Sequence, residues 1–545
     1  MSSPPTLRLW WYPPGARPLY TQPPESSHGF FQRPFFLWMP YKMWACRLVC
    51  PSCDTKLTGA GLYKTVRRVL DRDGWYFMGT EYLECRSCGK KIATWAQDII
   101  NQLDLSHQDQ FPAVLTYKLS CHKSVILQMR QQTLGNSATC LRKQLVEDHT
   151  ETWMSCTATY LGVLEKLGVA GAAVQPVTVP PLHPVPTVGW LLSVFVRDAL
   201  SRLEATKARV TSIFGKILKM ESTKKMTSKL AGKAAGTAAW VTNVGNEYGQ
   251  VLMSVLTAAK GDGLLPLAAG LMRRYREAQV APPAVLYVDR DCCSLAGRKH
   301  AAAMFSEWDR LVVRLDVWHL MQRFARGVTT ESHQLYPQFM ARLSYAIYLW
   351  DQDDLALLEK AKRAEEGRDS YIHLSAKELV RHCRRYTRGA AETERLIQEL
   401  LDQFWDLQNN LGVVLIHRSS GSGALQGELT KGGIRLPVYR CARGSTSLEF
   451  FHLHLNGFIP GTSASALHFQ VYLLEGLVRW NEDRGRASVE GVQRLVPRSY
   501  DARRQNYLNR LTQKYMGNLF FCIYMMHLAQ MDVAGTNTSP LWPTP

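Results

Sequence analysis

Two pairs of cysteines, Cys50-x-x-Cys53 and Cys85-x-x-Cys88, restrict the fold of the N-terminal part of the chain more than any other feature. The pairs stand in turn-forming sequences, CPSC and CRSCGKK, and the stretch WYFMGTEYLEC leads into the second pair with strand character. Two tight turns can supply four thiolates in the tetrahedron that structural Zn²⁺ prefers. Four cysteines leave no position for water, so we expect this zinc to contribute folding energy and not catalysis.

Alternatives to this zinc site are two unrelated turns or a redox pair. Cys46, just before the first pair, is an alternative ligand, although a core position suits it better. The N-terminal sequence MSSPPTLRLWWYPPGARP places Pro where a secretory signal needs an uninterrupted apolar run, so secretion is not expected. Thirteen cysteines without such a signal indicate a reducing compartment, where paired cysteines bind metal more often than they form disulfides.

The length of 545 residues predicts two or three domains. A formal net charge of +19 favours a polyanionic partner such as nucleic acid, and a merely soluble basic surface or a basic membrane-surface protein are the alternatives. No membrane span is expected, because no stretch approaches the roughly 20 apolar residues that one needs.

Composition and periodicity predict the domain organisation. Pro-rich stretches mark an arm and a linker, and amphipathic stretches mark helices. The predicted parts are a disordered Pro-rich arm at 1–35, a small zinc-binding α+β domain with the four paired cysteines at 36–100, a helical connector at 101–168, a Pro-rich linker at 169–189, an α/β core at 190–330 and 411–490, a helical insertion at 331–410, and a C-terminal helix with a disordered tail at 491–545.

The core begins with three predicted strands, IFGKILKMES, TAAWVTNVG and QVLMSVLTAA, and Asn246–Gly249 is a hairpin turn between the last two. Two further strands, AVLYVD and RLVVRL, alternate with helices. Three antiparallel strands followed by two strands with helical crossovers predict an α/β fold with a mixed sheet covered by helices. In such a sheet the first and fourth strands can lie side by side.

Acidic residues stand at the ends of those two strands. Glu221 ends the first and Asp289 ends the fourth, so we expect them to converge. Metal-dependent cleavage of phosphodiesters needs carboxylates from separate elements, and Mg²⁺ prefers such oxygen ligands. Asp291 is an alternative to Asp289. Glu449 is the third candidate, although Thr446-x-x-Glu449 also fits a helix-capping box.

The blocks VLYVDRDCC, RLVVRLDVWHLMQRF and STSLEFFHLHLN resemble those of Mutator-like and related cut-and-paste transposases. From about Trp38 to Trp480 the chain resembles an uncharacterised transposase-derived family that pairs a Cys-rich N-terminal domain with this core. The resemblance implies a ribonuclease-H-like fold with an inserted helical subdomain, Mg²⁺ or Mn²⁺ as a catalytic cofactor, and DNA as substrate.

Carried over to this chain, the resemblance assigns the second carboxylate to Asp289, the third to Glu449 and a Trp-His block to Trp318 and His319. It assigns the first carboxylate to Glu221, where the family has Asp. One extra methylene displaces a ligand by about 1 Å, which can cost roughly a hundredfold in rate.

Asp316 stands where the family often has Cys, so a metal role of its Trp-His block is left open. His319 is expected to orient a phosphate or a carboxylate, or else to form a hydrogen bond within the fold at a helix start.

Basic residues flank the predicted site and are candidate contacts to a DNA backbone. A solvated helix or strand face is the alternative for any such run. The candidates are Lys219, Lys224, Lys225, Lys229 and Arg290.

The sequence therefore predicts a nuclear, transposase-derived DNA-binding protein with a metal-dependent core for phosphodiester cleavage and strand transfer, and homo-oligomerisation is compatible with it. The alternative is a domesticated, catalytically silent DNA-binding or scaffolding protein. A protein-interaction module, in which zinc and helices carry the function, is a third hypothesis.

Overall fold

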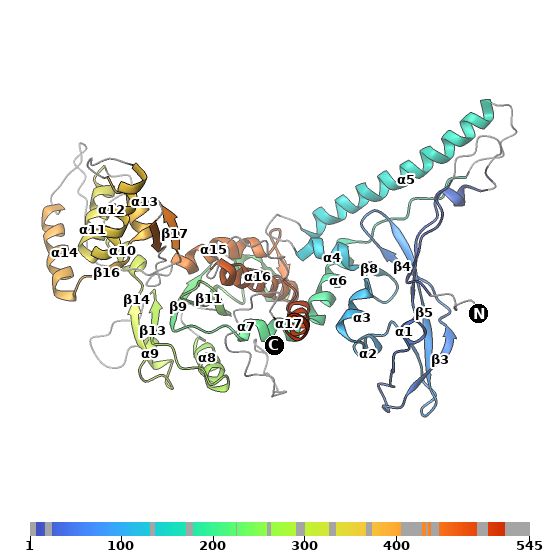
Figure 1. The fold of residues 1–545 in the computed structure, drawn as a ribbon, viewed down its shortest axis with the longest axis horizontal. Coiled ribbons are helices and arrows are strands. Elements are labelled where there is room, and N and C mark those ends of the chain that lie inside the picture. Colours follow the sequence, from blue (N-terminus) through green and yellow to red (C-terminus); the bar gives the residue numbers. More distant parts are fainter. Residues whose placement is uncertain are drawn as a thin grey trace. The chain divides into compact units, whose positions relative to one another are not determined.

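The computed structural model describes residues 7–16, 24, 26–130, 137–169, 178–224, 226–258, 263–289, 300–325, 334–366, 373–404, 428–431, 434–437, 446–487 and 500–517. The chain forms two compact units, Met1–Leu203 and Glu204–Pro545, both built from helices and strands (Figure 1). Across these described ranges, no helix has the length and apolar character that a membrane crossing requires.

The first unit is organised around a mixed sheet whose central strand is β5 (Trp75–Cys85). The strand order is β1 (Trp10–Trp11), β2 (Phe35–Trp38), β5, β4 (Arg67–Leu70), β8 (Ser120–His122) and β7 (Ala113–Leu115), while β3 (Leu57–Leu62) and β6 (Lys91–Ala93) also pair with β5. Aromatic and aliphatic side chains of this sheet pack with α1 (Pro40–Trp44), α2 (Gln97–Ile100) and the residues around α3 (Leu105–Gln110).

Part of the predicted disordered arm belongs to this sheet, so the prediction is wrong for residues 10–11 and 27–30. Trp10 and Trp11 form β1, which pairs with β2, and Ser27–Phe30 form the short helix η1. The ring centroid of Trp10 lies 4.8 Å from that of Phe36. Burial of these aromatic rings outweighs the local tendency of Pro-rich sequence to stay extended.

The predicted helical connector also differs from the structure. It contains α4 (Lys123–Arg130) and α5 (Ala138–Val169), but β7 and β8 extend the first sheet through pairing of β8 with β4. Helix α6 (Val188–Ser201) lies in the first unit, since Asp198 of α6 forms an ion pair with Arg130 of α4. The predicted boundary at residue 190 therefore falls within α6, whereas the units divide after Leu203.

The second unit contains a five-stranded sheet in the order β12 (Val251–Thr257), β11 (Trp240–Asn246), β9 (Ile217–Thr223), β13 (Val285–Val288) and β14 (Val312–Leu315). The pairs β12–β11 and β11–β9 are antiparallel, and β9–β13 and β13–β14 are parallel. The predicted mixed α/β sheet is confirmed, and the first and fourth strands of this sheet along the chain, β9 and β13, lie side by side.

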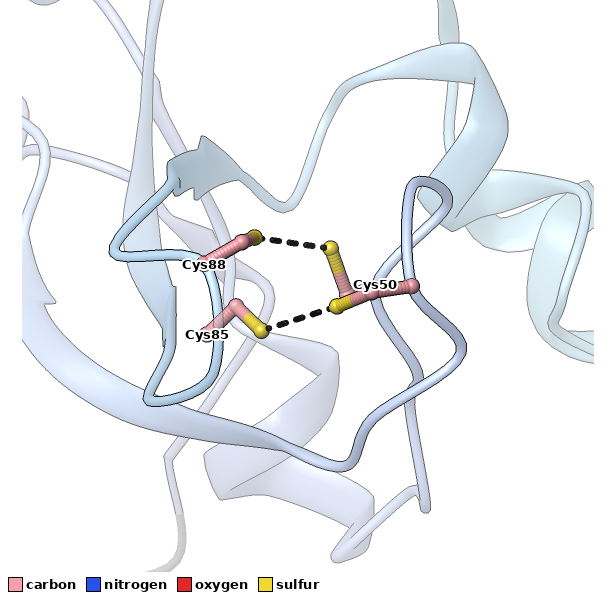
Figure 2. A group of neighbouring side chains, drawn as sticks. Cys50, Cys85 and Cys88 are labelled. Carbon is pink, nitrogen blue, oxygen red and sulfur yellow. Dashed lines mark hydrogen bonds between the residues drawn. The ribbon is translucent and has the colours of Figure 1, made fainter.

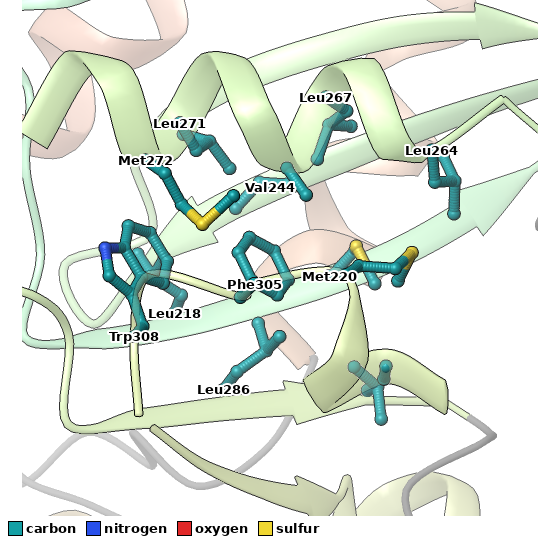
Figure 3. Packing of buried hydrophobic residues seen from close by; sticks show 14 of the residues in the cluster. Leu218, Met220, Val244, Leu264, Leu267, Leu271, Met272, Leu286, Phe305 and Trp308 are labelled. Atoms are coloured by element: carbon teal, nitrogen blue, oxygen red, sulfur yellow. The ribbon is translucent and has the colours of Figure 1, made fainter. Parts of the chain in front are cut away.

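The two faces of this sheet differ in chemistry. One face packs an apolar core against α8 (Leu265–Glu277), including Leu218, Met220, Val244 and Leu286 (Figure 3). Side chains alternate along a strand, so the residues between these positions point to the opposite face.

On that opposite face, β9 contributes Lys219 and Glu221, and β11 contributes Asn243 and Gly245. Helices α15 (Thr446–Phe458) and α16 (Ala466–Ala487) contact this side of the sheet. A Cβ atom on Gly245 would lie 3.0 Å from Leu448 Cδ2, so glycine permits the close approach of α15. A row of buried polar side chains therefore lies between sheet and helix.

The remaining elements of the second unit surround this sheet or follow it in sequence. The region predicted to be almost wholly helical also contains a two-stranded ribbon, β15 (Tyr348–Trp350) with β16 (Arg385–Thr387). The other elements are α7 (Leu203–Thr211), η3 (Thr227–Lys229), β10 (Leu230–Ala231), η4 (Gly232–Ala234), α9 (His300–Ala303), α10 (Val317–Ala325), α11 (Tyr336–Ile347), α12 (Gln352–Glu366), α13 (Ala376–His382), α14 (Ala390–Phe404), β17 (Glu428–Lys431), β18 (Ile434–Pro437), β19 (Ala464–Ser465) and α17 (Ala502–Met516).

Candidate metal centres

The four paired cysteines of the first unit form one cluster (Figure 2). Cys50 Sγ lies 3.7 Å from Cys88 Sγ, and Cys53 Sγ lies 3.4 Å from Cys85 Sγ. All four sulfur atoms lie within 4.8 Å of one another. Zn–S bonds of about 2.3 Å in a tetrahedron imply sulfur separations of about 3.8 Å, so the cluster can hold a metal ion such as zinc.

The two turns that present these cysteines have the same backbone hydrogen bonds. In the first, the N–H of Asp54 donates to the carbonyl of Cys50, and in the second the N–H of Gly89 donates to the carbonyl of Cys85. Asp54 and Gly89 both adopt positive φ angles, 56° and 70°. This repeated geometry directs both thiols of each pair toward the centre of the cluster.

The thiols of the cluster have divergent acidities. Hydrogen bonds from the hydroxyl and backbone N–H of Thr55, and from the Cys85 thiol, lower the pKa of Cys53 to about 6. The Lys90 N–H lowers the pKa of Cys88, but burial and the neighbouring thiols outweigh it and raise that pKa to about 11. Four thiolates therefore do not coexist here without a cation between them.

A second group of convergent side chains lies in the second unit. Glu221 at β9, His319 in α10 and Glu449 in the first turn of α15 offer ligand atoms that all lie within 4.8 Å of one another. His319 Nε2 lies 3.4 Å from Glu221 Oε1. The Glu221 side chain is 4% exposed, so this arrangement is shielded from bulk water on the sheet side.

Asp316 fixes the orientation of the His319 ring. Its Oδ2 accepts a hydrogen bond from the backbone N–H of His319 at 3.2 Å and lies 2.8 Å from His319 Nδ1. A carboxylate at Nδ1 holds the proton there and leaves the Nε2 lone pair directed at the group around Glu221. The backbone contact also satisfies a free donor in the first turn of α10.

The electrostatics of Glu221 indicate a site that is short of positive charge. Burial is the main cause that raises the pKa of Glu221 to about 10, and Glu449, Asp316 and Asp289 add to the shift. Glu221 Oε2 is buried, and the described part of the chain gives it no hydrogen-bond donor. A divalent cation would supply the missing partner and compensate the facing carboxylates.

Sequence reasoning assigned no role to Asp316 beyond the departure from Cys. The signal was present, because an Asp three residues before a His fits an N-cap that contacts the N3 backbone donor. The spacing alone does not predict that the His319 ring also contacts the Asp316 carboxylate. The side chain of Trp318, the partner of His319 in the resemblance, lies outside the described part of the chain.

Asp289 directly follows β13, one residue beyond Val288, just as Glu221 lies one residue beyond Met220, the partner of Val288 on β9. Its charge contributes to the raised pKa of Glu221, but it is not one of the three residues whose ligand atoms converge. Arg323 donates to the backbone carbonyl of Asp289. The alternative residue Asp291, and the proposed DNA contact Arg290, lie outside the described residues.

The predicted DNA-binding lysines occupy different environments. Lys219 is fully buried, and its Nζ lies 3.3 Å from Ser447 Oγ. The prediction that Lys219 contacts a DNA backbone is therefore wrong, because neither solvent nor a polyanion reaches its side chain. Lys224 is exposed, and its Nζ lies 4.7 Å from the centre of the Trp240 ring. Lys225 lies outside the described residues.

Lys229 stabilises the end of α15. Its Nζ donates to the carbonyls of Asn456 and Ile459 at 2.7 and 2.8 Å. These carbonyls belong to the last turn of α15 and the residue just after it, where cations are favourable. Burial lowers the pKa of Lys229. Its side chain therefore holds the helix that presents Glu449.

Comparison with known protein families identifies a match in the first part of the chain. The family described as "Domain of unknown function (DUF6729)" matches residues 2–200, which coincides with the first unit and its cysteine cluster. A search of curated proteins gave no match to the chain.

Proposed function

We propose that the second unit is a divalent-metal-dependent core that cleaves phosphodiester bonds in DNA. The observation on which this rests is the convergence of Glu221, His319 and Glu449 around a buried, unsatisfied carboxylate oxygen. Ligands from three separate elements, two carboxylates and one imidazole, are a donor set for a divalent ion.

The order and directions of the five strands support a ribonuclease-H-like core for this unit. In such an arrangement the first strand of the sheet lies between the antiparallel pair and the parallel pair. Glu221 does not end that strand as predicted, because β9 continues to Thr223, but it lies one residue beyond the last residue paired with β13. The resemblance to Mutator-like transposases supports the same core and extends the proposal to strand transfer and to a nuclear location.

A divalent ion in this site would supply Lewis acidity and a water of lowered pKa. The chain's own residues do the rest. Glu221 and Glu449 would hold the ion from the sheet and from α15, and Asp316 orients His319 so that its Nε2 would face it.

The donor set favours Mn²⁺ over Mg²⁺, because imidazole suits transition metals whereas Mg²⁺ prefers oxygen and water. The zinc proposed for the four cysteines has a separate role, which is to stabilise the first unit. Both units together give a DNA-binding protein with one structural and one reactive metal centre.

The test is cleavage of plasmid DNA by the full chain with Mn²⁺, Mg²⁺ or chelator. Cleavage is expected with Mn²⁺ and is expected to fall at least about 100-fold in Glu449→Gln, which keeps the shape but removes the charge. Glu307→Gln is the matched control, since Glu307 forms an exposed ion pair with Arg276. Cleavage by Glu449→Gln at the rate of the native chain contradicts the proposal.

Replacement of Glu221 by Asp is a second, sharper variant. In this structure Glu221 already reaches His319 and Glu449, so Glu221→Asp withdraws its carboxylate by about 1 Å and is expected to reduce Mn²⁺-dependent cleavage. A gain of activity in Glu221→Asp would indicate instead that the native chain has lost catalysis by acquiring Glu.

One observation favours a second candidate function, that of a catalytically silent DNA-binding protein. Asp289 is not among the converging ligands, so the group offers ligands for a single ion, whereas two-metal cleavage needs more carboxylates. This function predicts salt-dependent DNA binding without cleavage at saturating Mn²⁺. Lys224→Ala is expected to weaken that binding without a change in Tm, since Lys224 is exposed.

A further inference from the structure

Asn243 lies directly opposite Glu221 on the neighbouring strand. The register of β11 and β9 pairs these two residues, so their side chains project from the same face of the sheet. Asn243 is fully buried, and its face of the sheet is the one that α15 covers. A buried carboxamide is therefore adjacent to the ligand group of Glu221, His319 and Glu449.

The contacts of Asn243 fix one end of its carboxamide and leave the other without a partner. Nδ2 donates to Nε2 of His452 at 3.0 Å. His452 is itself buried and stands one helical turn after Glu449 on α15, so both reach the sheet from the same side of the helix. Asn243 Oδ1 is buried without a hydrogen-bond donor from the described part of the chain.

Two residues that lie directly opposite each other on neighbouring strands thus each carry a buried oxygen without a hydrogen-bond donor among the described residues, Oδ1 of Asn243 and Oε2 of Glu221. Buried acceptors are almost always paired, because a lost hydrogen bond to water is costly when nothing replaces it. Both acceptors here are hard oxygen donors, and the neighbouring imidazole and carboxylate already form a cation-binding group.

Asn246, three residues further along β11, provides a contrast within the same strand. It is also fully buried, but its Nδ2 donates to the Phe214 carbonyl and the Gln250 side chain, and its Oδ1 accepts from two backbone N–H groups. Both ends of the buried Asn246 carboxamide therefore have hydrogen-bond partners within the protein, at a position where this residue only stabilises a turn. The fold leaves the oxygen of Asn243 open beside the acidic group.

We propose that Asn243 is a further ligand of this metal site: its Oδ1 binds the divalent cation held by Glu221, His319 and Glu449, and His452 is the positioning residue that orients the carboxamide. This inference rests on the proposed metal site. It makes the set three oxygen ligands and one nitrogen, with β11 joining β9, α10 and α15 in holding the ion.

The test is titration of the metal-depleted full chain with Mn²⁺ by calorimetry, together with thermal unfolding with and without Mn²⁺. Asn243→Leu removes the oxygen, and its Mn²⁺ affinity is expected to fall about 10-fold or more. Without metal, its Tm is expected to change little, because the variant removes the unsatisfied buried acceptor together with the hydrogen bond to His452. Asn243→Asp retains an oxygen and is expected to bind Mn²⁺ at least as tightly as the native chain.

Asn246→Leu is the matched control, since it removes a carboxamide whose hydrogen bonds lie within the protein. Its Tm is expected to fall without metal, while the Mn²⁺ affinity of the folded protein is unchanged. A purely structural role of Asn243 predicts the same pattern for Asn243→Leu, and that result overturns the inference. Equal weakening of Mn²⁺ binding in Asn243→Leu and Asn243→Asp also overturns it.

The titration separates this inference from the proposed function. If the native chain binds no Mn²⁺ at Glu221, native and Glu221→Gln proteins give the same titration. In that case both the proposed function and the inference about Asn243 are wrong. If the native chain binds Mn²⁺ and loses it in Glu221→Gln, but Asn243→Leu binds as the native chain does, the metal site stands and Asn243 is not part of it.

Discussion

His319 Nδ1 lies 2.8 Å from Asp316 Oδ2, while the other ring nitrogen of His319 lies 3.4 Å from Glu221 Oε1. The imidazole of His319 thus contacts the fully buried carboxylate of Asp316 through one ring nitrogen and lies near the carboxylate of Glu221 with the other. The arrangement resembles the carboxylate–histidine pairs that orient metal ligands in proteins. Asp316 therefore has the role of orienting the His319 ring, which can be tested separately from its role as a helix cap.

Asp316→Asn tests that orienting role. Asn caps a helix as well as Asp does, so α10 is expected to keep its start. A neutral amide no longer holds the Nδ1 proton by charge, and Mn²⁺ affinity is expected to fall about 10- to 100-fold. Mn²⁺ titration with circular dichroism measures both properties. Asp501→Asn, at the N-cap of α17, is the matched control and is expected to leave Mn²⁺ binding unchanged.

Gly245→Ala tests how closely α15 must approach the sheet. The new Cβ would lie 3.0 Å from Leu448 Cδ2 and 3.1 Å from the Gln250 carbonyl oxygen, so the Leu448 side chain, next to Glu449 on α15, must give way by a few tenths of an ångström. Overpacking of this kind costs about 1–3 kcal/mol, and Mn²⁺ affinity is expected to fall together with the Tm.

Gly476→Ala is the control for that experiment. A Cβ at Gly476 would meet the Phe458 ring at 2.3 Å, which disturbs the far end of α15. Thermal unfolding is expected to show a lower Tm for both variants. If Gly476→Ala lowers Mn²⁺ affinity as much as Gly245→Ala does, the effect comes from general destabilisation and not from local displacement of Glu449.

Cys53→Ser tests the metal of the first unit. Zinc content, measured by mass spectrometry on the purified chain, is expected to be one ion for the four-cysteine cluster and to fall in the variant. Loss of zinc is expected to destabilise this unit, because metal binding is part of its folding free energy. Cys140→Ser is the control, since Cys140 is an exposed cysteine of α5. Unchanged zinc content in Cys53→Ser would refute the cluster as the zinc site.

Asp198→Asn tests a buried ion-pair network between α4 and α6. Asp198 Oδ2 lies 2.6 Å from Arg130 and 3.0 Å from Arg202. Burial alone would raise the pKa of Asp198, but the two guanidinium groups outweigh it and lower that pKa below its ordinary value. Asp198→Asn leaves two arginines without their carboxylate and is expected to cost about 3–5 kcal/mol at neutral pH.

The pH dependence follows from the direction of that shift. Because the folded pKa of Asp198 lies below its unfolded value, the stabilisation is present above the unfolded pKa and is lost as pH falls through the folded one. Urea unfolding is therefore expected to show native and Asp198→Asn proteins converging below about pH 4. Glu204→Gln, which alters an exposed pair with Lys207, is expected to change stability by less than about 0.5 kcal/mol.

Parts of the fold that depend on local pattern were predictable. The strands β9, β11, β12, β13 and β14 were recognised by their apolar runs, and the turn at Asn246–Gly249 by its composition. The strands β1, β7 and β8 were missed, because short segments become strands only when a distant partner strand offers hydrogen bonds. A Pro-rich arm and a helical connector were the local alternatives.

The sequence alone predicted the cysteine cluster, because each pair and its turn are local, and it selected Glu221, Asp289 and Glu449 as candidates, although β9 extends beyond Glu221 to Thr223. Only the tertiary structure decided which groups converge. The register of β11 on β9 places Asn243 beside Glu221, and the approach of α15 over Gly245 brings Glu449 and His452 to that face. Side-chain spacing along a chain fixes neither strand register nor the distance of a covering helix, and both are set by packing of segments far apart in sequence.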